Sequence, residues 1–232
     1  MLSYNIHSGR NRLGNDTFDQ QTNFLCSLSP DLLALQEVDR NWPRSFGANQ
    51  ARDLANALNM QYFFSPNLMG DWSVGSVVHQ YGIALLWKGN VEAVAGIALP
   101  GVPATEHRGL VYAELATQYG RMVFANTHLS RSPSERILQA AFLAEWVSCC
   151  RRPLLLAGDF NMQNDSPEYQ TITAGLTDLT ADLGLVTFPD HVPDRQRDYL
   201  FASETFRATT VAAVDCDLSD HRPVVGELQV ID

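Results

Sequence analysis

The amino-acid sequence predicts an α/β fold built on mixed β-sheets. Apolar stretches of strand length recur along the whole chain and outnumber the segments with a helical pattern. Several successive stretches are joined by connections too short for a helix, so some neighbouring strands must be antiparallel. No repeat, low-complexity tract or linker interrupts the 232 residues. We therefore expect one domain over residues 1–232.

Strands and helices alternate in the first part of the chain. Met1–Tyr4 is strand-like, and Asn15–Asp19 introduces a helix that continues to about Leu28, where Ser29-Pro30 ends it. A strand, a helix and a strand are then expected at Leu32–Leu35, Asn49–Leu58 and Tyr81–Trp87. The segment Asn67–Gln80 before the last strand is expected to be a long loop. Such loops are often functional lids, and Trp72 in this one would either meet the substrate or pack in the fold.

Further strands are expected at Val91–Ala98, Gly109–Leu115, Met122–Ala125, Leu154–Ala157, Thr209–Val214 and Val224–Val230, with a short helix at Pro167–Ala174. The most clearly marked helix runs from Ser132 to about Cys150. Ser132 suits the N-cap, Pro133 suits the first helical position, and Glu135 completes a capping box. Its buried stripe is expected to consist of Ile137, Ala141 and Ala144, with Leu138 and Phe142 beside them.

Composition narrows the range of functions. The chain is 45% hydrophobic and long enough to bury a large core, but no apolar run approaches the roughly 20 residues that a membrane span needs. No signal peptide is visible, so we expect either a cytoplasmic protein or a mature fragment. The four cysteines lack the spacing of a metal site and are expected to be free thiols; they are Cys26, Cys149, Cys150 and Cys216. The net charge of −10 argues against tight, nonspecific binding of nucleic acid.

Polar clusters at the ends of the apolar stretches carry the functional signal. There are five: Tyr4-Asn5-Ile6-His7, Leu35-Gln36-Glu37-Val38-Asp39, Asn126-Thr127-His128-Leu129, Gly158-Asp159-Phe160-Asn161 and Ser219-Asp220-His221-Arg222-Pro223. Strands that end in carboxylates, amides and imidazoles bring those groups to one edge of a sheet. This mixture suits a hard divalent cation and a phosphate group.

The order of these clusters resembles the endonuclease/exonuclease/phosphatase superfamily, the DNase-I-like metal-dependent phosphoesterases. The resemblance extends from Ser3 to about Glu227, and Arg197-Asp198-Tyr199-Leu200-Phe201 stands in its expected place between the last two clusters. It implies a four-layer α/β/β/α sandwich with two packed mixed sheets. It also implies Mg²⁺ as the cofactor, with Mn²⁺ as a substitute.

The resemblance assigns the metal to carboxylate and amide groups. Glu37 would be the principal ligand, with Asn5 beside it and Asp220 completing the coordination sphere through water. Judged alone, Glu37 could instead be an exposed carboxylate paired with Arg40. Gln36 is expected to orient its neighbours without binding the metal.

The catalytic roles follow from the same resemblance. Asp159 would activate or position the attacking water, and Asn161 would hold the phosphate or that water. Asp198 would fix the tautomer of His221 and favour its protonated form. His128 would contact a phosphate oxygen or the leaving group.

Arginines supply almost all of the positive charge, since Lys88 is the only lysine among the 16 Lys and Arg residues. Several follow the polar clusters and would form a cationic rim that favours a compact anionic substrate: Arg10, Arg12, Arg40, Arg44 and Arg131. The alternative for each is an ordinary solvated arginine. Arg108 lies in Glu106-His107-Arg108-Gly109, which resembles a Glu-Pro-Arg-Gly sequence in similar bacterial proteins, and is expected to face the substrate.

The sequence therefore predicts a Mg²⁺-dependent phosphoesterase, and we expect a phosphodiesterase. Its substrate could be a nucleic acid, a lipid headgroup or a small phosphorylated metabolite, and no obligate protein partner is evident. The alternatives are a nuclease, a sphingomyelinase-like lipid phosphodiesterase, and a binding module that has lost catalysis. The last is disfavoured because Glu37, Asp159 and His221 are all retained.

Overall fold

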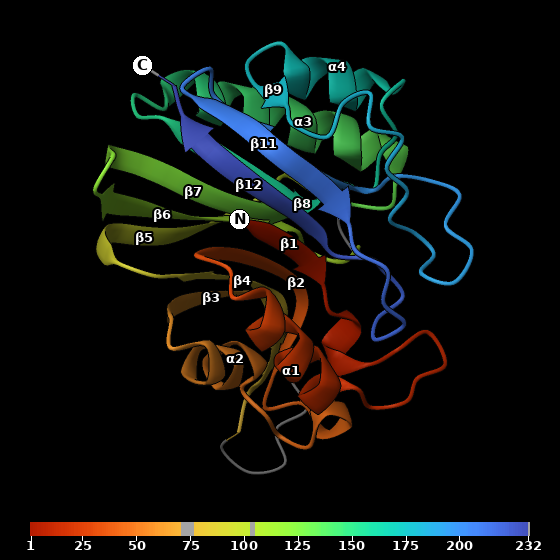
Figure 1. Cartoon of the computed structure of the whole chain (residues 1–232). Coiled ribbons are helices and arrows are strands. Elements are labelled where there is room, and N and C mark those ends of the chain that lie inside the picture. Colours follow the sequence, from red (N-terminus) through yellow and green to blue (C-terminus); the bar gives the residue numbers. More distant parts are fainter. Residues whose placement is uncertain (71–76, 103–104, 232) are drawn as a thin grey trace.

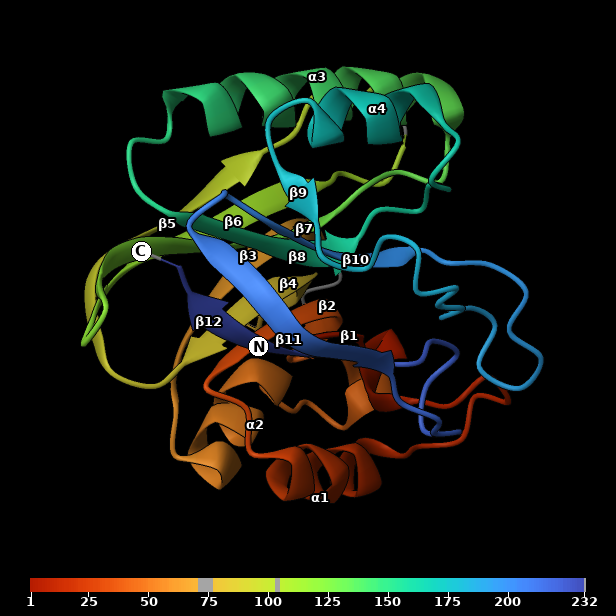
Figure 2. The same ribbon diagram turned by 45° about the horizontal axis from the view of Figure 1, so that its top comes forward.

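The computed structural model describes residues 1–70, 77–102 and 105–231. In this part of the chain, two six-stranded sheets pack face to face and helices cover the outer face of each sheet (Figures 1 and 2). Each sheet contains both parallel and antiparallel neighbours. These four layers confirm the expected α/β/β/α sandwich with mixed sheets.

The first sheet has the strand order β11-β12-β1-β2-β4-β3. Its strands are β1 (Leu2–Asn5), β2 (Leu32–Arg40), β3 (Gln61–Gly70), β4 (His79–Trp87), β11 (Phe206–Ala213) and β12 (Val224–Val230). Only β1 and β2 are parallel among these neighbours. Helix α1 (Phe18–Leu28) connects them, and α2 (Gln50–Leu58) follows β2 on the same outer face (Figure 2).

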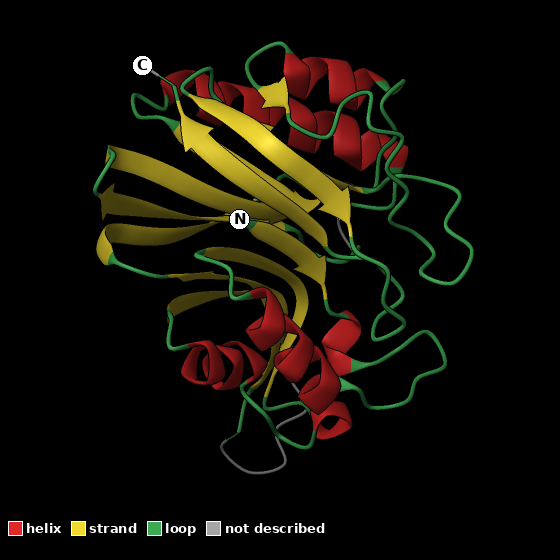
Figure 3. Cartoon of the chain, in the orientation of Figure 1, coloured by secondary structure: helices red, strands yellow, loops and turns green. Residues whose placement is uncertain are grey.

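The second sheet has the strand order β5-β6-β7-β8-β10-β9. Its strands are β5 (Asn90–Ala98), β6 (Gly109–Thr117), β7 (Gly120–His128), β8 (Leu154–Asp159), β9 (Thr177–Asp178) and β10 (Asp198–Ala202). Here β7 and β8 are the parallel pair, and helix α3 (Pro133–Cys149) connects them. The short helix α4 (Pro167–Thr173) lies beside α3 over this sheet (Figure 3).

Three apolar clusters hold the layers together. Ile83 and Phe124 belong to the cluster between the sheets, whereas Leu143 and Leu156 belong to the one between the second sheet and its helices. The third joins the first sheet to α1 and α2 and includes Leu25. Burying each such side chain stabilises the folded state by about 1.5–3 kcal/mol. The two sheets are therefore held firmly against each other, and so is the edge at which their strands end together.

The expected buried face of α3 was wrong. Ile137 and Leu138 are about half exposed, whereas the helix buries Glu135, Gln139, Ala140 and Leu143. The reason is that polar residues of α3 satisfy buried backbone: Gln139 accepts from the Ser130 N–H and donates to the Pro100 carbonyl.

The expected capping box of α3 is also absent. The side chain of Ser132 makes no capping hydrogen bond. Glu135 instead accepts from the Val102 N–H and from the hydroxyls of Thr105 and Ser130. Pro133 does occupy the first turn of the helix, as expected.

The long loop expected at Asn67–Gln80 is shorter than predicted. β3, a strand that the sequence did not indicate, extends to Gly70, and β4 begins at His79. Trp72 lies outside the described residues. No helix in the described ranges is long and apolar enough to cross a membrane.

Candidate active site

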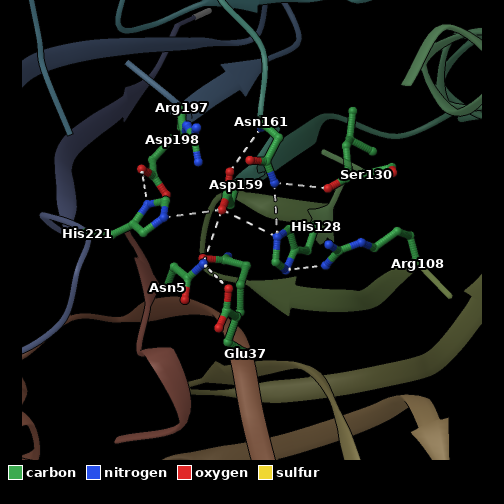
Figure 4. A network of polar contacts seen from close by, with 12 residues as sticks. Asn5, Glu37, Arg108, His128, Ser130, Asp159, Asn161, Arg197, Asp198 and His221 are labelled. Carbon is green, nitrogen blue, oxygen red and sulfur yellow. Dashed lines mark hydrogen bonds and ion pairs between the residues drawn. The ribbon is translucent and has the colours of Figure 1, made fainter. Parts of the chain in front are cut away.

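Asp159 is the centre of a buried polar network at one edge of the sandwich (Figure 4). It is the last residue of β8, and its Oδ2 lies 3.1 Å from Asn5 Nδ2, 3.4 Å from His128 Nε2 and 3.6 Å from His221 Nε2. Its Oδ1 accepts from the backbone N–H of Asn161 at 2.9 Å. One carboxylate therefore contacts groups from both sheets.

The first sheet contributes Asn5 and Glu37. Asn5 ends β1, and its Nδ2 also donates to Glu37 Oε1 at 3.0 Å. The pairing of β2 with β4 shifts register between Leu35 and Val38, and Glu37 has a positive φ of 57°. This bulge turns the half-buried Glu37 carboxylate toward the site, a frequent use of bulges near functional residues.

Close strand packing sets the spacing between His128 and Asp159. β7 and β8 pair in parallel with these two residues in register, and both strands end at the site. A side chain at Gly158, the residue before Asp159, would place its Cβ 2.1 Å from the Thr127 carbonyl oxygen. Only glycine allows this approach of the two backbones.

Asn161 reaches the same network by a turn that the sequence did not predict. Its φ is 50°, so the residues after Asp159 leave the extended conformation. Its Nδ2 donates to the Leu129 carbonyl at 3.1 Å and lies 3.2 Å from His128 Nε2. Phe160 between them is fully buried and packs edge-on against Phe201.

Asp198 and His221 form a buried pair on the other side of Asp159. Asp198 begins β10 opposite Asp159, and its Oδ2 lies 2.9 Å from His221 Nδ1. Ser219 supports the segment that carries His221, because its hydroxyl donates to the Asn5 carbonyl at 2.7 Å. The pair therefore presents His221 Nε2 toward Asp159.

Electrostatics distinguish the two histidines. Burial lowers the pKa of His221, but the carboxylates of Asp198 and Asp159 outweigh it and raise this pKa to about 10. Burial and the nearby Arg108 guanidinium hold the pKa of His128 well below its usual value. Burial also raises the pKa of Asp159, against the charge of His221. At neutral pH, His221 is a cation and His128 is neutral.

Two groups of residues could hold a metal ion. The carboxylates of Asp159 and Asp198 offer ligand atoms within 4.8 Å of one another and of His221, whose ring, as a cation at neutral pH, is not itself a ligand. Glu37 supplies further carboxylate oxygen atoms beside them, and Asn5 donates to Glu37 through Nδ2 while its Oδ1 accepts from the backbone N–H of His7. Oδ1 of Asp198 is buried and has no hydrogen-bond partner among the described residues. These hard oxygen donors fit a magnesium-like cation.

Not every predicted site residue lies in this network. The Asp220 carboxylate lies 3.8 Å from His7 Nδ1 and 3.4 Å from the Ser219 hydroxyl, and no direct contact with Asn5 or Glu37 is found in the described chain. It is close enough to His221 to raise the pKa of that histidine.

The predicted arginine rim is mostly engaged elsewhere. Both ends of the Arg44 guanidinium bind the Asp39 carboxylate at 2.6 and 2.7 Å, and the group stacks on Trp42 and Tyr81. Arg10 donates to the carbonyls of Gly14 and Arg44 and so ties two loops together. Arg12 lies 3.8 Å from the Asp190 carboxylate, and the Arg40 guanidinium lies over the Phe64 ring. Arg131 is exposed, and its charge contributes to lowering the pKa of His128.

Sequence reasoning named Arg197 only as part of a motif, without a role, and did not name Phe188 or Thr187. Arg197 points into the network beside Asp198 (Figure 4). Its guanidinium carbon lies 4.0 Å from the centre of the Phe188 ring, and that ring lies 4.8 Å from the His221 ring. The Thr187 hydroxyl accepts from the backbone N–H of Arg197 at 3.0 Å. Adjacency to Asp198 could have indicated Arg197, but nothing near Phe188 in sequence marks it.

Comparisons with known proteins identify the family and the fold. A family model described as the Endonuclease/Exonuclease/phosphatase family matches residues 2–221. A comparison with curated protein sequences finds no significant match.

Several solved structures have the same fold. A mannosyl-6-phosphatase from Bacteroides thetaiotaomicron VPI-5482 is 18% identical, with a TM-score of 0.78 and coverage of 98% of each chain. The human Nocturnin catalytic domain is 20% identical, with a TM-score of 0.73, and the alignment covers 99% of this chain and 92% of that one. A humanized D. rerio TDP2 is 17% identical, with a TM-score of 0.74 and coverage of 99% and 98%. The chain therefore belongs to the endonuclease/exonuclease/phosphatase family, whose members hydrolyse phosphate esters.

Proposed function

We propose that this protein is a Mg²⁺-dependent phosphoesterase that hydrolyses the phosphodiester of a compact alcohol. The observation that carries the proposal is the position of Asp159, whose carboxylate contacts Asn5, His128 and His221 within 3.6 Å. A carboxylate base, a neutral imidazole and a cationic imidazole around one point suit the attack of water on a phosphorus atom.

Asp159 would act on the attacking water. Burial raises its pKa, so the carboxylate is a stronger base than an exposed aspartate would be. As the water oxygen bonds to phosphorus, a water proton passes to Asp159, the bond from phosphorus to the alcohol oxygen breaks, and the departing alkoxide takes up a proton from solvent. The backbone N–H of Asn161 holds the other carboxylate oxygen and fixes the direction of the base.

The two histidines and Arg197 would bind the phosphate. The cationic His221 faces the site through Nε2, since Asp198 holds Nδ1. The Arg197 guanidinium lies in the same part of the network (Figure 4). Positive charge and N–H groups there would stabilise the negative charge that develops on the phosphate oxygens.

Asn5 and Glu37 would hold the Mg²⁺ ion, with Asp220 acting through water. When bound, the ion supplies positive charge that neutralises the phosphate. The solved structures with a similar fold include a mannosyl-6-phosphatase, the Nocturnin catalytic domain and TDP2. These different proteins do not point to a single class of substrate. The net charge of −10 favours a small substrate over a long nucleic acid.

The test is a hydrolysis screen in Mg²⁺ and in chelator. The panel contains bis-aryl and aryl phosphates, sugar phosphates, sphingomyelin, an abasic oligonucleotide and plasmid DNA. We expect Mg²⁺-dependent release from small esters that Asp159→Asn abolishes. Cleavage confined to plasmid or oligonucleotide would favour the nuclease alternative, and no hydrolysis of any ester would overturn the proposal.

A further inference from the structure

The contacts of Arg108 determine which nitrogen of His128 carries a proton. Arg108 Nη1 lies 3.0 Å from His128 Nδ1 and 2.8 Å from Glu106 Oε1, and the side chain is only 5% exposed (Figure 4). A guanidinium can only donate hydrogen bonds. His128 Nδ1 must therefore accept, and an accepting ring nitrogen carries no hydrogen.

The proton of a neutral His128 ring is then on Nε2. That atom lies 3.4 Å from Asp159 Oδ2 and 3.2 Å from Asn161 Nδ2. The Asn161 amide is oriented by the Leu129 carbonyl, to which its Nδ2 donates at 3.1 Å. Asn161 Nδ2 is also a donor, so it competes with Arg108 for the one accepting nitrogen of the ring. The charged Arg108 group is the nearer donor, and Asp159 Oδ2 can accept from an N–H at Nε2. With the proton on Nε2, the ring and the Asn161 amide are two N–H donors beside Asp159. An anionic oxygen placed there would accept from both.

Backbone pairing brings the guanidinium to the ring. Gly109 pairs with His128 in the ladder of β6 and β7, so Arg108 lies just beyond the paired residue. The Arg108 carbonyl accepts from the Leu99 N–H at 2.9 Å, which fixes the start of β6. A Cβ at Gly109 would lie 2.5 Å from Asn67 Oδ1, so a larger residue there would displace the Asn67 side chain.

We propose that Arg108 is a positioning residue that locks His128 as the neutral tautomer with its proton on Nε2, ready to donate to a phosphate oxygen. The role of His128 in binding the substrate rests on the proposed function, whereas its tautomer is inferred from the contact with Arg108 alone. Arg108 would thus act on the substrate through His128, since its own side chain is buried between Glu106 and the ring. Burial and the Arg108 charge, which lower the pKa of His128, agree with a neutral ring.

The direct test is the ¹⁵N NMR spectrum of the histidine rings in the metal-free protein at neutral pH. His128→Gln identifies the signals of residue 128 by their disappearance. We expect His128 to show an unprotonated Nδ1 and a protonated Nε2. In Arg108→Met, which removes the donor but keeps an unbranched side chain, we expect a mixture of tautomers. Arg108→Lys, which keeps a donor, should restore the Nε2-protonated form at least in part.

Arg136→Met is the matched control. Arg136 is likewise a mostly buried arginine paired with a carboxylate, that of Glu168, but it lies on α3 outside the network. Its replacement should leave the His128 signals unchanged. Unchanged signals from the other five histidines and an intact thermal transition would show that Arg108→Met folds. A wild-type spectrum with protonated Nδ1, or an unchanged tautomer in Arg108→Met, would overturn the inference.

Activity gives a second and separate readout. If the proposed function holds, Arg108→Met should lower kcat by roughly 10- to 100-fold, with a smaller change in KM, because the ring still occupies its place but donates less often. Arg108→Lys should recover part of kcat. An equal kcat in Arg108→Met would contradict the role in catalysis. If the wild-type protein hydrolyses no ester, the proposed function fails, while the NMR result still decides the tautomer.

Discussion

His128 and His221 occupy opposite sides of Asp159, and the difference between them lies in their outer partners. Both rings are buried, and both present Nε2 to the same carboxylate oxygen, at 3.4 and 3.6 Å (Figure 4). The Nδ1 of His221 faces the Asp198 carboxylate, whereas the Nδ1 of His128 faces the Arg108 guanidinium. One ring is therefore held as a cation and the other as a neutral donor. The charge of a buried histidine is decided by the group behind it.

The largest expected effect comes from removing the group behind His221. Asp198→Asn and His221→Ala should each lower kcat by roughly 10²- to 10³-fold, because both remove the cation beside the phosphate. Groups that act as a unit are not additive, so the double variant should be scarcely slower than either single one. Turnover of an aryl phosphate ester in Mg²⁺ measures this. Losses that multiply would mean that the two residues act independently.

Removal of the metal is expected to have the next largest effect, and it does not distinguish between the two histidines. Chelation followed by dialysis should abolish hydrolysis, and Mg²⁺ or Mn²⁺ should restore it. Glu37→Gln should raise the Mg²⁺ concentration for half-maximal rate by more than the roughly 10- to 100-fold typical of residues that only support ligands. Unfolding of the metal-free protein should hardly change, as Glu37 is half-exposed. Full activity after chelation would refute a metal requirement.

The two histidines should also affect stability with opposite dependence on pH. His221 has a raised pKa of about 10, so its contribution is fully present below the unfolded value of about 6.5 and is lost as the pH rises toward 10. His128 has a lowered pKa, so the folded state loses stability as the pH falls below about 6.5. Urea unfolding in chelator, comparing wild type with His221→Asn and His128→Asn from pH 5 to 10, measures both. The same slope for both variants would show that their environments do not differ as described.

The smallest expected effect concerns the exposed Arg131, whose charge reaches both His128 and Arg197. Arg131→Gln should reduce kcat/KM by a few-fold at low salt and flatten its salt dependence, with little change in kcat, because a surface charge steers an anion more than it assists chemistry. Arg207→Gln is the control, since Arg207 is an exposed residue near the start of β11, at the end far from the site. Equal salt slopes for both variants would make Arg131 an ordinary solvated residue.

Sequence reasoning performed best where chemistry and strand ends coincide. The polar clusters that contain Asn5, His128 and Asp159 were placed at strand ends, and in the structure these three residues are the last ones of β1, β7 and β8. The four-layer fold followed from the same clusters, because their order along the chain is specific to one family. The position of a polar residue at the end of a strand can be predicted from the sequence, because it depends only on where the strand ends along the chain.

It performed worst where tertiary contacts override local preference. The apolar Ile137 and Leu138 are exposed because the buried face of α3 is occupied by Glu135 and Gln139, which bind loop backbone far away in sequence. The contact of Phe188 with His221 joins positions 33 apart with no periodic signal. The Glu37 bulge likewise depends on the partner strand β4.

The strand order has a consequence for how the site is held together. The first four strands form one part of the first sheet, but the hairpin of β5 and β6 that follows pairs with β7 in the second. In return, β7 to β10 build the second sheet, and the hairpin of β11 and β12 pairs with β1 in the first. The N-terminal and C-terminal halves are thus interlocked by exchanged hairpins. Separating the halves would break both sheets. It would also divide the site, because Asn5 and Glu37 come from one half and His128, Asp159 and His221 come from the other. The geometry of the candidate site is therefore kept as long as both sheets stay intact.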